Sequence, residues 1–220
     1  MKVLGILGSP HRKIGNTYLL MESMFEELER EGVETEIVLL PNLNIKYCTG
    51  CATCLSLGEC PQKDDAIEIK NKMLEVDGIV FGSPVYFLSV TAQMKTFIDR
   101  CLSFGHRPSL HGKYGASVSV YAGVGDVDAV ADYMNGVLQS FGVVTVGKVC
   151  GLATKPGDLK RNDLLRAKDL GRELFKTMRD KKVYPIRFSK AMRNLILREK
   201  DFLKVDYKYW KEKGWLEEVI

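Results

Sequence analysis

Segments that favour β-strands alternate with segments that favour α-helices along most of this 220-residue chain. Five short apolar runs with the character of strands span residues 3–9, 33–40, 78–84, 114–123 and 143–153. Each is followed by a segment with apolar residues at helical spacing, at residues 16–32, 63–77, 90–102, 126–142 and 163–178. Five such units predict an α/β fold in which helices cover both faces of a parallel sheet.

Two of the expected helices carry apolar stripes that we expect to face the core. The first stripe is formed by Met94, Phe97, Ile98, Cys101 and Leu102, and the second by Val127, Val130, Ala131, Met134, Leu138 and Phe141. Cys101 is therefore interpreted as a core residue, and so is Cys150, which lies in the last apolar strand. The three histidines have no metal-ligand spacing, and His106 and His111 are expected in loops.

The loop after the first expected strand is a candidate phosphate site, because open α/β sheets bind ligands beyond the carboxyl ends of their strands. Residues 8–17 offer the hydroxyls of Ser9 and Thr17 and the amide of Asn16 at the start of a helix. Backbone N–H groups and the helix dipole attract phosphate at such a place. The loop is neither a P-loop nor the three-glycine dinucleotide motif. A polar loop with an ordinary helix cap remains the alternative.

The loops after the third and fourth expected strands have features that suit a flat ligand. Residues 82–87 present the aromatic rings of Tyr86 and Phe87 beside a proline, and residues 121–126 contain two glycines that allow close backbone approach. Taken singly, each of these loops has a composition that is common in loops without a ligand. Together with the phosphate loop they suit a planar ring that carries a phosphorylated tail.

Four of the six cysteines, Cys48, Cys51, Cys54 and Cys60, fall within 13 positions with the spacing C-x2-C-x2-C-x5-C, followed by Pro61. Three thiols two residues apart favour an iron–sulfur cluster over zinc, which usually takes two separated C-x2-C pairs. A redox-active thiol pair would leave two cysteines unused. A loop of about 20 residues is also uncommon in a compact domain unless it is functional.

The start of the chain lacks the long apolar stretch and small-residue cleavage site of a signal peptide. No run of about 18 apolar residues occurs, so no membrane-spanning helix is expected. We therefore expect a cytoplasmic protein whose thiols stay reduced, which argues against disulfides.

The C-terminal part of the chain differs from the rest in charge. From residue 181 onward it carries 11 lysines and arginines against 6 aspartates and glutamates, although the whole chain has a net charge of only +4. We expect a helix within residues 188–203 that Ser189 caps, followed by a segment rich in aromatic residues. Acidic residues are interspersed and no RNA-binding motif is present, so nucleic acid is not favoured as a partner. We expect an arm that packs on the core, around the active site or on a neighbouring subunit.

The stretches GSPHRKIGNT (8–17), GIVFGSPVYF (78–87) and MKTFIDR (94–100), in this order, resemble the NADPH-dependent FMN reductase branch of the flavodoxin-like proteins. With the cysteine run, the chain is similar to the iron–sulfur flavoproteins of that branch. The resemblance implies a doubly wound, flavodoxin-like sheet with strand order 2-1-3-4-5 in a domain spanning residues 1–182, and a C-terminal extension at 183–220. The cysteine loop, residues 42–61, follows the second strand.

The resemblance also implies FMN and a [4Fe–4S] cluster. Position by position, the residues expected to bind FMN are Ser9, Arg12, Gly15, Asn16, Thr17, Pro84, Val85, Tyr86, Phe87, Tyr121 and Gly123. The cluster run resembles that of bacterial ferredoxins, with five residues in place of three in its last gap. Because no second cysteine set exists, Cys48, Cys51, Cys54 and Cys60 are all expected to ligate one cluster.

The expected function is electron transfer between a one-electron, ferredoxin-like donor or NAD(P)H and an acceptor such as oxygen, peroxide or a quinone. No catalytic nucleophile or acid–base pair is expected, because the chemistry belongs to the cofactors. A homodimer or homotetramer is expected to bring the cluster of one subunit near the FMN of another. The first alternative is a cluster-free NAD(P)H-dependent FMN or quinone reductase. The second is a zinc-stabilised binding module.

Overall fold

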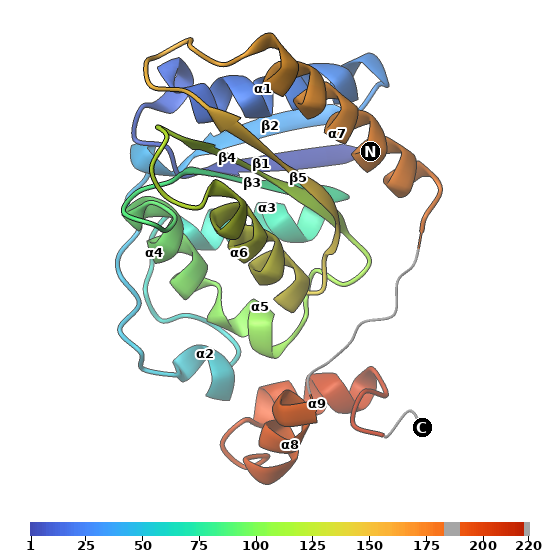
Figure 1. The fold of residues 1–220 in the computed structure, drawn as a ribbon. Helices are drawn as coiled ribbons and strands as arrows, with labels where there is room; N and C mark the ends of the chain where they lie inside the picture. The colour runs from blue at the N-terminus through green and yellow to red at the C-terminus, as the bar shows by residue number, and fades with distance from the viewer. Residues whose placement is uncertain (183–189, 218–220) are drawn as a thin grey trace.

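The computed structural model describes residues 1–182 and 190–217, and it has a five-stranded sheet between two layers of helices (Figure 1). The strands are β1 (Lys2–Leu7), β2 (Glu34–Leu39), β3 (Gly78–Pro84), β4 (Tyr114–Tyr121) and β5 (Val144–Leu152). The helices around the sheet are α1 (Asn16–Arg30), α3 (Ala66–Glu75), α4 (Ala92–Arg100), α5 (Leu102–His106), α6 (Val127–Ser140) and α7 (Arg161–Arg179). The remaining elements are η1 (Arg12–Ile14), η2 (Leu40–Asn42), α2 (Thr53–Ser56), α8 (Lys190–Arg198) and α9 (Lys204–Glu212).

The strands lie in the order β2-β1-β3-β4-β5 and all neighbouring pairs are parallel, which confirms the predicted α/β, flavodoxin-like fold. Because β1 lies between β2 and β3, the chain winds in one direction from β1 to β2 and in the other from β3 onward. The loops after β1 and β3 therefore leave the sheet on opposite sides. Such a switch point is where open α/β sheets bind their ligands.

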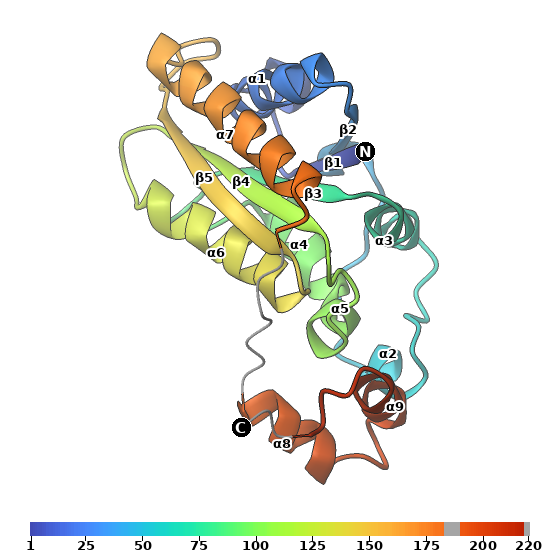
Figure 2. The same ribbon diagram turned by 90° about the vertical axis from the view of Figure 1, so that its right-hand side faces the viewer.

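The two faces of the sheet are covered by different helices. α1 and α7 lie on one face, and α3, α4 and α6 lie on the other (Figures 1 and 2). The central strand β1 is apolar on both sides, as expected for a parallel strand between two helical layers. Val3 and Leu7 belong to the core beneath α1 and α7, whereas Leu4 and Ile6 belong to the core beneath the other three helices.

The single helix expected over residues 90–102 is two helices, α4 and α5. Cys101 lies between them, because it is both the C-cap residue of α4 and the N-cap residue of α5. Cys101 is fully buried, as expected, but Leu102 leaves the apolar stripe and is 38% exposed. The short helix α2 inside the cysteine loop was not expected, and Cys150 is only half-buried in β5.

The two C-terminal helices lie away from the sheet. α8 falls within the expected helix, but Ser189, its expected cap, lies outside the described residues. α9 lies beside α2 of the cysteine loop (Figure 2). Across residues 1–182 and 190–217, no helix combines the length and apolar character needed to cross a membrane.

Close packing between α1 and α7 generates a stability prediction. A Cβ at Gly171 of α7 would lie 2.6 Å from the backbone oxygen of Met24 in α1, whereas a Cβ at Gly136 of α6 would meet nothing within 4 Å. We expect Gly171→Ala to lower the free energy of unfolding by about 1–3 kcal/mol, because neither backbone can yield. Gly136→Ala should raise it by about 0.5–1 kcal/mol, because alanine favours the helix. Urea unfolding followed by circular dichroism measures both, and equal effects would contradict the packing argument.

Candidate functional site

A pocket of 170 Å³ opens at the carboxyl ends of the central strands. Of the residues expected from the sequence, Ser9, Asn16, Thr17, Pro84, Val85, Tyr86 and Tyr121 line it. Arg12, Gly15, Phe87 and Gly123 belong to the same loops but are not among the lining residues. The pocket also has a wall that sequence reasoning missed, formed by residues 153–156 after β5, which include Thr154 and Lys155.

The phosphate loop is held tightly against the sheet. Ser9 and Thr17 are almost fully buried. A Cβ at Gly15 would lie 3.0 Å from Ser9 Oγ, so only glycine lets the loop close this tightly before α1. The N–H groups in the first turn of a helix have no acceptor within that helix. Asn16 and Thr17, the first two residues of α1, line the pocket. Arg12 stands in the left-handed region (φ 53°) and is exposed.

Asn16 lines the pocket, and its side-chain amide also bonds to the loop after β5. Its Nδ2 donates to the carbonyl oxygen of Lys155 at 2.7 Å, and its Oδ1 accepts from the backbone N–H of Gly157 at 2.8 Å. The amide therefore ties the loop after β5 to the start of α1 and holds Lys155 at the pocket. This bond joins residues 139 positions apart. No local pattern in the sequence signals such a contact.

Thr91, the N-cap of α4, fixes the loops beneath the pocket. Its hydroxyl donates to the carbonyl of Gly8 at 2.7 Å and accepts from the N–H of Met94. Its own N–H donates to Ser83 Oγ at 3.0 Å. A side chain at Gly8 would collide with this hydroxyl at 2.8 Å. One buried threonine thus joins the ends of β1 and β3 to the start of α4.

The loop after β3 projects apolar side chains from the mouth of the pocket. The backbone of Val85 bonds to Val120 at 2.8 Å, and Tyr86 forms a β-bridge with Ser89. Between them the chain turns sharply, with Phe87 and Leu88 both at positive φ. Phe87 is 99% exposed and points away from the pocket that it was expected to line.

The cysteine loop leaves the end of β2 and runs beside α4 and α5 to α3 (Figures 1 and 2). Cys48 and Cys51 are exposed, and Cys54 and Cys60 are half-buried. Burial raises the pKa of Cys54, an effect that the Lys70 ammonium opposes and that the charges of Cys60 and Cys48 reinforce. Cys54 therefore lies within electrostatic range of two other thiols. Within the described parts of the chain, however, no three potential ligands already stand at metal-binding geometry.

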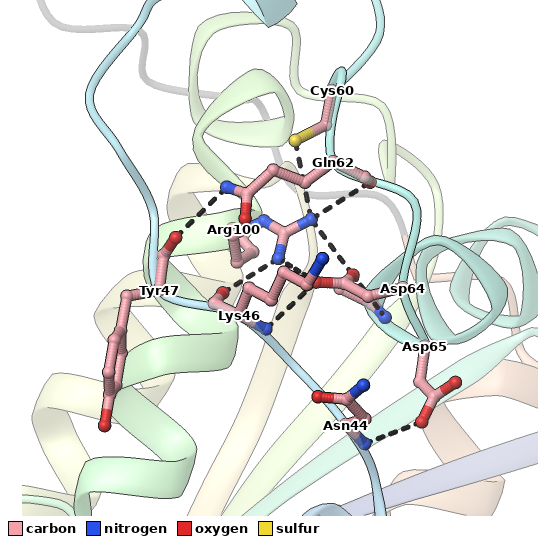
Figure 3. Close-up of polar contacts among 9 residues, drawn as sticks. Asn44, Lys46, Tyr47, Cys60, Gln62, Asp64, Asp65 and Arg100 are labelled. Carbon is pink, nitrogen blue, oxygen red and sulfur yellow. Dashed lines mark hydrogen bonds and ion pairs between the residues drawn. The ribbon is translucent and has the colours of Figure 1, made fainter.

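A buried arginine ties both arms of the cysteine loop to the core (Figure 3). Arg100, at the end of α4, pairs with the buried carboxylate of Asp64 at 2.5 Å and 3.0 Å. It also donates to the carbonyl of Lys46 at 2.8 Å and to Cys60 Sγ at 3.5 Å. Its Nε is buried without a hydrogen-bond partner in this structure. Sequence reasoning missed Arg100, although it ends the quoted stretch at residues 94–100.

The Asp64 carboxylate is ionised because of this setting. Burial alone would raise its pKa, but the hydrogen bond from Arg100 and the backbone N–H of Lys46 outweigh burial and hold the pKa below its usual range. Asp64 also accepts from the N–H of Ala66 at the start of α3. The Arg100–Asp64 pair therefore joins α4, α3 and the segment before Cys48.

A second arginine holds the segment between Cys54 and Cys60. Arg107, just after α5, donates to the carbonyls of Cys54 at 3.0 Å and Gly58 at 3.1 Å. It pairs with the fully buried Asp206 of α9. Leu55 of α2 packs in one small core with residues of the C-terminal helices, among them Trp210.

The chain is similar to known proteins in sequence and in fold. The model of the NADPH-dependent FMN reductase family matches residues 1–156. The chain belongs to this family. An iron–sulfur flavoprotein of Archaeoglobus fulgidus is 47% identical over 221 residues, which cover 98% of this chain and 100% of the relative. Another from Methanocaldococcus jannaschii is 37% identical over 79% of this chain and 95% of its own. The chain is thus a member of the iron–sulfur flavoprotein family.

Solved structures agree on the fold. An NAD(P)H:quinone oxidoreductase from Methanothermobacter marburgensis superposes with a TM-score of 0.61 at 18% identity, covering 80% of this chain and 97% of the other. A flavodoxin from the domain Archaea does so with a TM-score of 0.55 at 16% identity, covering 81% and 99%. The family membership makes the protein a flavin-dependent oxidoreductase, and FMN is the flavin of its family.

The thiol of Cys51 provides a test of the loop geometry. Hydrogen bonds from Thr53, whose hydroxyl lies 3.3 Å from the sulfur, lower the pKa of Cys51 to about 7, whereas burial raises that of Cys101 to about 12. In the iron-free protein, iodoacetamide at pH 7 should modify Cys51 and leave Cys101 intact. Thr53→Val should slow the reaction of Cys51 roughly three- to tenfold at pH 7, because fewer thiolates form. The difference should vanish above pH 9.

Peptide mass spectrometry over time measures these rates. Thr53→Ser is the matched control, because it keeps the hydroxyl and should react like the wild type. Equal rates for the valine and serine variants would show that the hydroxyl does not stabilise the thiolate.

Proposed function

We propose that the protein exchanges electrons between one-electron and two-electron partners by means of FMN in the strand-end pocket and a [4Fe–4S] cluster on Cys48, Cys51, Cys54 and Cys60. The observation that carries this proposal is the Arg100 anchorage, which fastens a four-cysteine loop to the same α4 that borders the flavin loops. When bound, the two groups supply single-electron and paired-electron transfer.

The donor set fits an iron–sulfur cluster. All four thiols come from one segment, and each of its two arms bonds to Arg100. Four thiolates around a cluster carry excess negative charge, which hydrogen bonds and nearby cations stabilise. Arg100 donates directly to Cys60, and the ammonium of Lys70 acts on Cys54. The buried Nε–H of Arg100 offers one further donor beside the loop.

The pocket fits a flavin mononucleotide. The buried hydroxyls of Ser9 and Thr17, with the N-terminal N–H groups of α1, provide an anion site for its phosphate. Lys155, whose backbone carbonyl accepts a hydrogen bond from Asn16, adds a cationic residue to the pocket lining. Val85, Tyr86 and Tyr121 supply apolar walls for the ring. These residues bind and orient the flavin and limit access of water to it.

The electron partners follow from the two sites. We propose a ferredoxin-like protein or NAD(P)H as the donor, and oxygen, peroxide or a quinone as the acceptor. The dependence on NADPH in the family description supports the nucleotide. The exposed position of Cys48 and Cys51 supports a protein partner that approaches the cluster directly.

We also propose that a second copy of the chain brings a cluster near the flavin. No residue of the cysteine loop lines the strand-end pocket, so the two proposed sites are separate within one chain. The apolar stripe of α4 is used in the core, where Met94 and Phe97 are fully buried, and it does not form the contact. Exposed apolar side chains instead surround the pocket mouth, and they are Ile14, Tyr86, Phe87, Leu88 and Val124.

The cluster is tested by cysteine replacement. Cys54→Ser should reduce bound iron from about four atoms per chain to a trace, because a cluster needs all four thiolates. Cys150→Ser is the matched control and should keep full iron. Both variants should retain FMN. Iron, sulfide, zinc and flavin are assayed on anaerobically purified protein. Full flavin without iron in the wild type, even after reconstitution, would favour the cluster-free reductase, and zinc without flavin would favour a binding module.

The subunit contact is tested at the pocket mouth. Phe87→Ser should lower the molar mass measured by light scattering, because a fully exposed aromatic ring loses its partner surface. Leu165→Ser, which replaces a half-exposed apolar side chain of α7 that does not line the pocket, is the control and should leave the mass unchanged. A wild type that is monomeric yet transfers electrons from cluster to flavin would refute the contact.

A further inference from the structure

Arg107 forms hydrogen bonds to the part of the cysteine loop that runs from the third cysteine toward the fourth. Its guanidinium donates to the carbonyl oxygens of Cys54 and Gly58 at 3.0 Å and 3.1 Å. The side chain is 9% exposed, so these hydrogen bonds form largely away from water. Both bonds come from Nη2, while Nη1 pairs with Asp206, so the rigid, planar guanidinium fixes the two carbonyls relative to that carboxylate.

The charge of Arg107 is balanced by a residue from the other end of the chain. Asp206 of α9 is fully buried, and one of its oxygens accepts from Arg107. Its other oxygen lies 3.0 Å from Nδ1 of His106. A buried carboxylate of this kind orients the arginine and removes the cost of leaving its charge uncompensated.

The surface of α9 fits the same segment of the loop. Trp210 is fully buried and donates from its indole to the carbonyl of His106 at 2.6 Å. It shares a small core with Leu55 of α2. A Cβ at Gly58 would lie 3.4 Å from Val205, so α9 rests against the loop backbone at this glycine.

We propose that α9 is a positioning element for the cysteine loop, and that Asp206 acts through Arg107 to hold the backbone from Cys54 to Gly58 in its ligating shape. The inference rests on the proposed cluster site. Neither residue touches a sulfur atom. Their role is to keep the separation of Cys54 and Cys60 constant during electron transfer and partner binding.

Two variants separate charge from shape. Asp206→Asn keeps the size of the side chain but leaves Arg107 without its counter-charge. Arg107→Lys keeps the positive charge but has a single nitrogen, so it cannot pair with Asp206 and bond to both carbonyls in the planar geometry of arginine. Asp132→Asn is the matched control, because it breaks a comparable ion pair, with Lys148 at 2.7 Å, on the exposed face of α6.

The first measurement is hydrogen exchange of the full chain after iron removal, read by mass spectrometry over peptides that span residues 52–60. Both variants should lose protection there, whereas Asp132→Asn should match the wild type. Flavin content and the unfolding midpoint of each variant are recorded on the same samples. A variant that loses flavin has a general folding defect, and the other variant then decides the question.

The second measurement uses anaerobically reconstituted protein. Both variants should lose iron to a chelator about 10–100-fold faster than the wild type, as is typical when a partner of a metal ligand is removed. Asp206→Asn should also shift the cluster reduction potential in the positive direction, because a negative charge is removed nearby. Arg107→Lys should leave the potential close to that of the wild type, because the net charge is unchanged.

The outcomes distinguish this inference from the proposed function. A wild type that takes up no iron would refute the cluster, and the exchange measurement would still show whether Asp206 and Arg107 hold the loop. A wild type that holds its cluster, with variants that exchange and release iron at wild-type rates, would overturn the positioning role alone.

Discussion

The cysteine loop depends on one buried ion pair. Arg100 and Asp64 face each other at the junction of α4 and α3, and both side chains are about 99% buried. A guanidinium at that depth is stable only with a counter-charge and further acceptors, and it finds them in Asp64 and in the backbone of the loop itself. The loop therefore supplies the groups that make the buried arginine stable, and the arginine in turn gives the loop a defined path. Losing either side would leave the other with an unpaired buried group.

The loops around the strand-end pocket are held differently, by hydrogen bonds between backbone groups and small neutral side chains. Thr91 joins the ends of β1 and β3 through Gly8 and Ser83, and Asn16 joins α1 to the loop after β5. Both contacts place hydrogen-bonded polar groups where strands of the same sheet end. The buried charged pairs Arg100–Asp64 and Arg107–Asp206 thus lie beside the cysteine loop, whereas neutral hydrogen bonds hold the loops around the pocket.

The architecture and the loops at the strand ends could be predicted from the sequence, but the contacts between side chains and distant partners could not. The five alternating units indicated a parallel sheet, and the strand order that the family resemblance implied was confirmed. The loops after β1, β3 and β4 do form the pocket wall. Asn16, however, binds the chain near Lys155, and Phe87 faces solvent. Arg107 and Asp206 are 99 residues apart, and no local pattern relates an arginine in one loop to an aspartate on a basic C-terminal helix.

The sequence by itself determined the local structure and the chemistry that is available: short apolar runs typical of buried strands, segments with apolar residues at helical spacing, a polar turn at the start of α1, and four thiols at fixed intervals. Those features depend on neighbours within a few residues, and so they can be read along the chain. Only the tertiary structure decided which charges are buried together, which loop completes the flavin pocket, and which helices cover the cysteine loop. Burial of a charge is favourable only when its partner arrives at the same place, and that is settled by the packing of the whole chain.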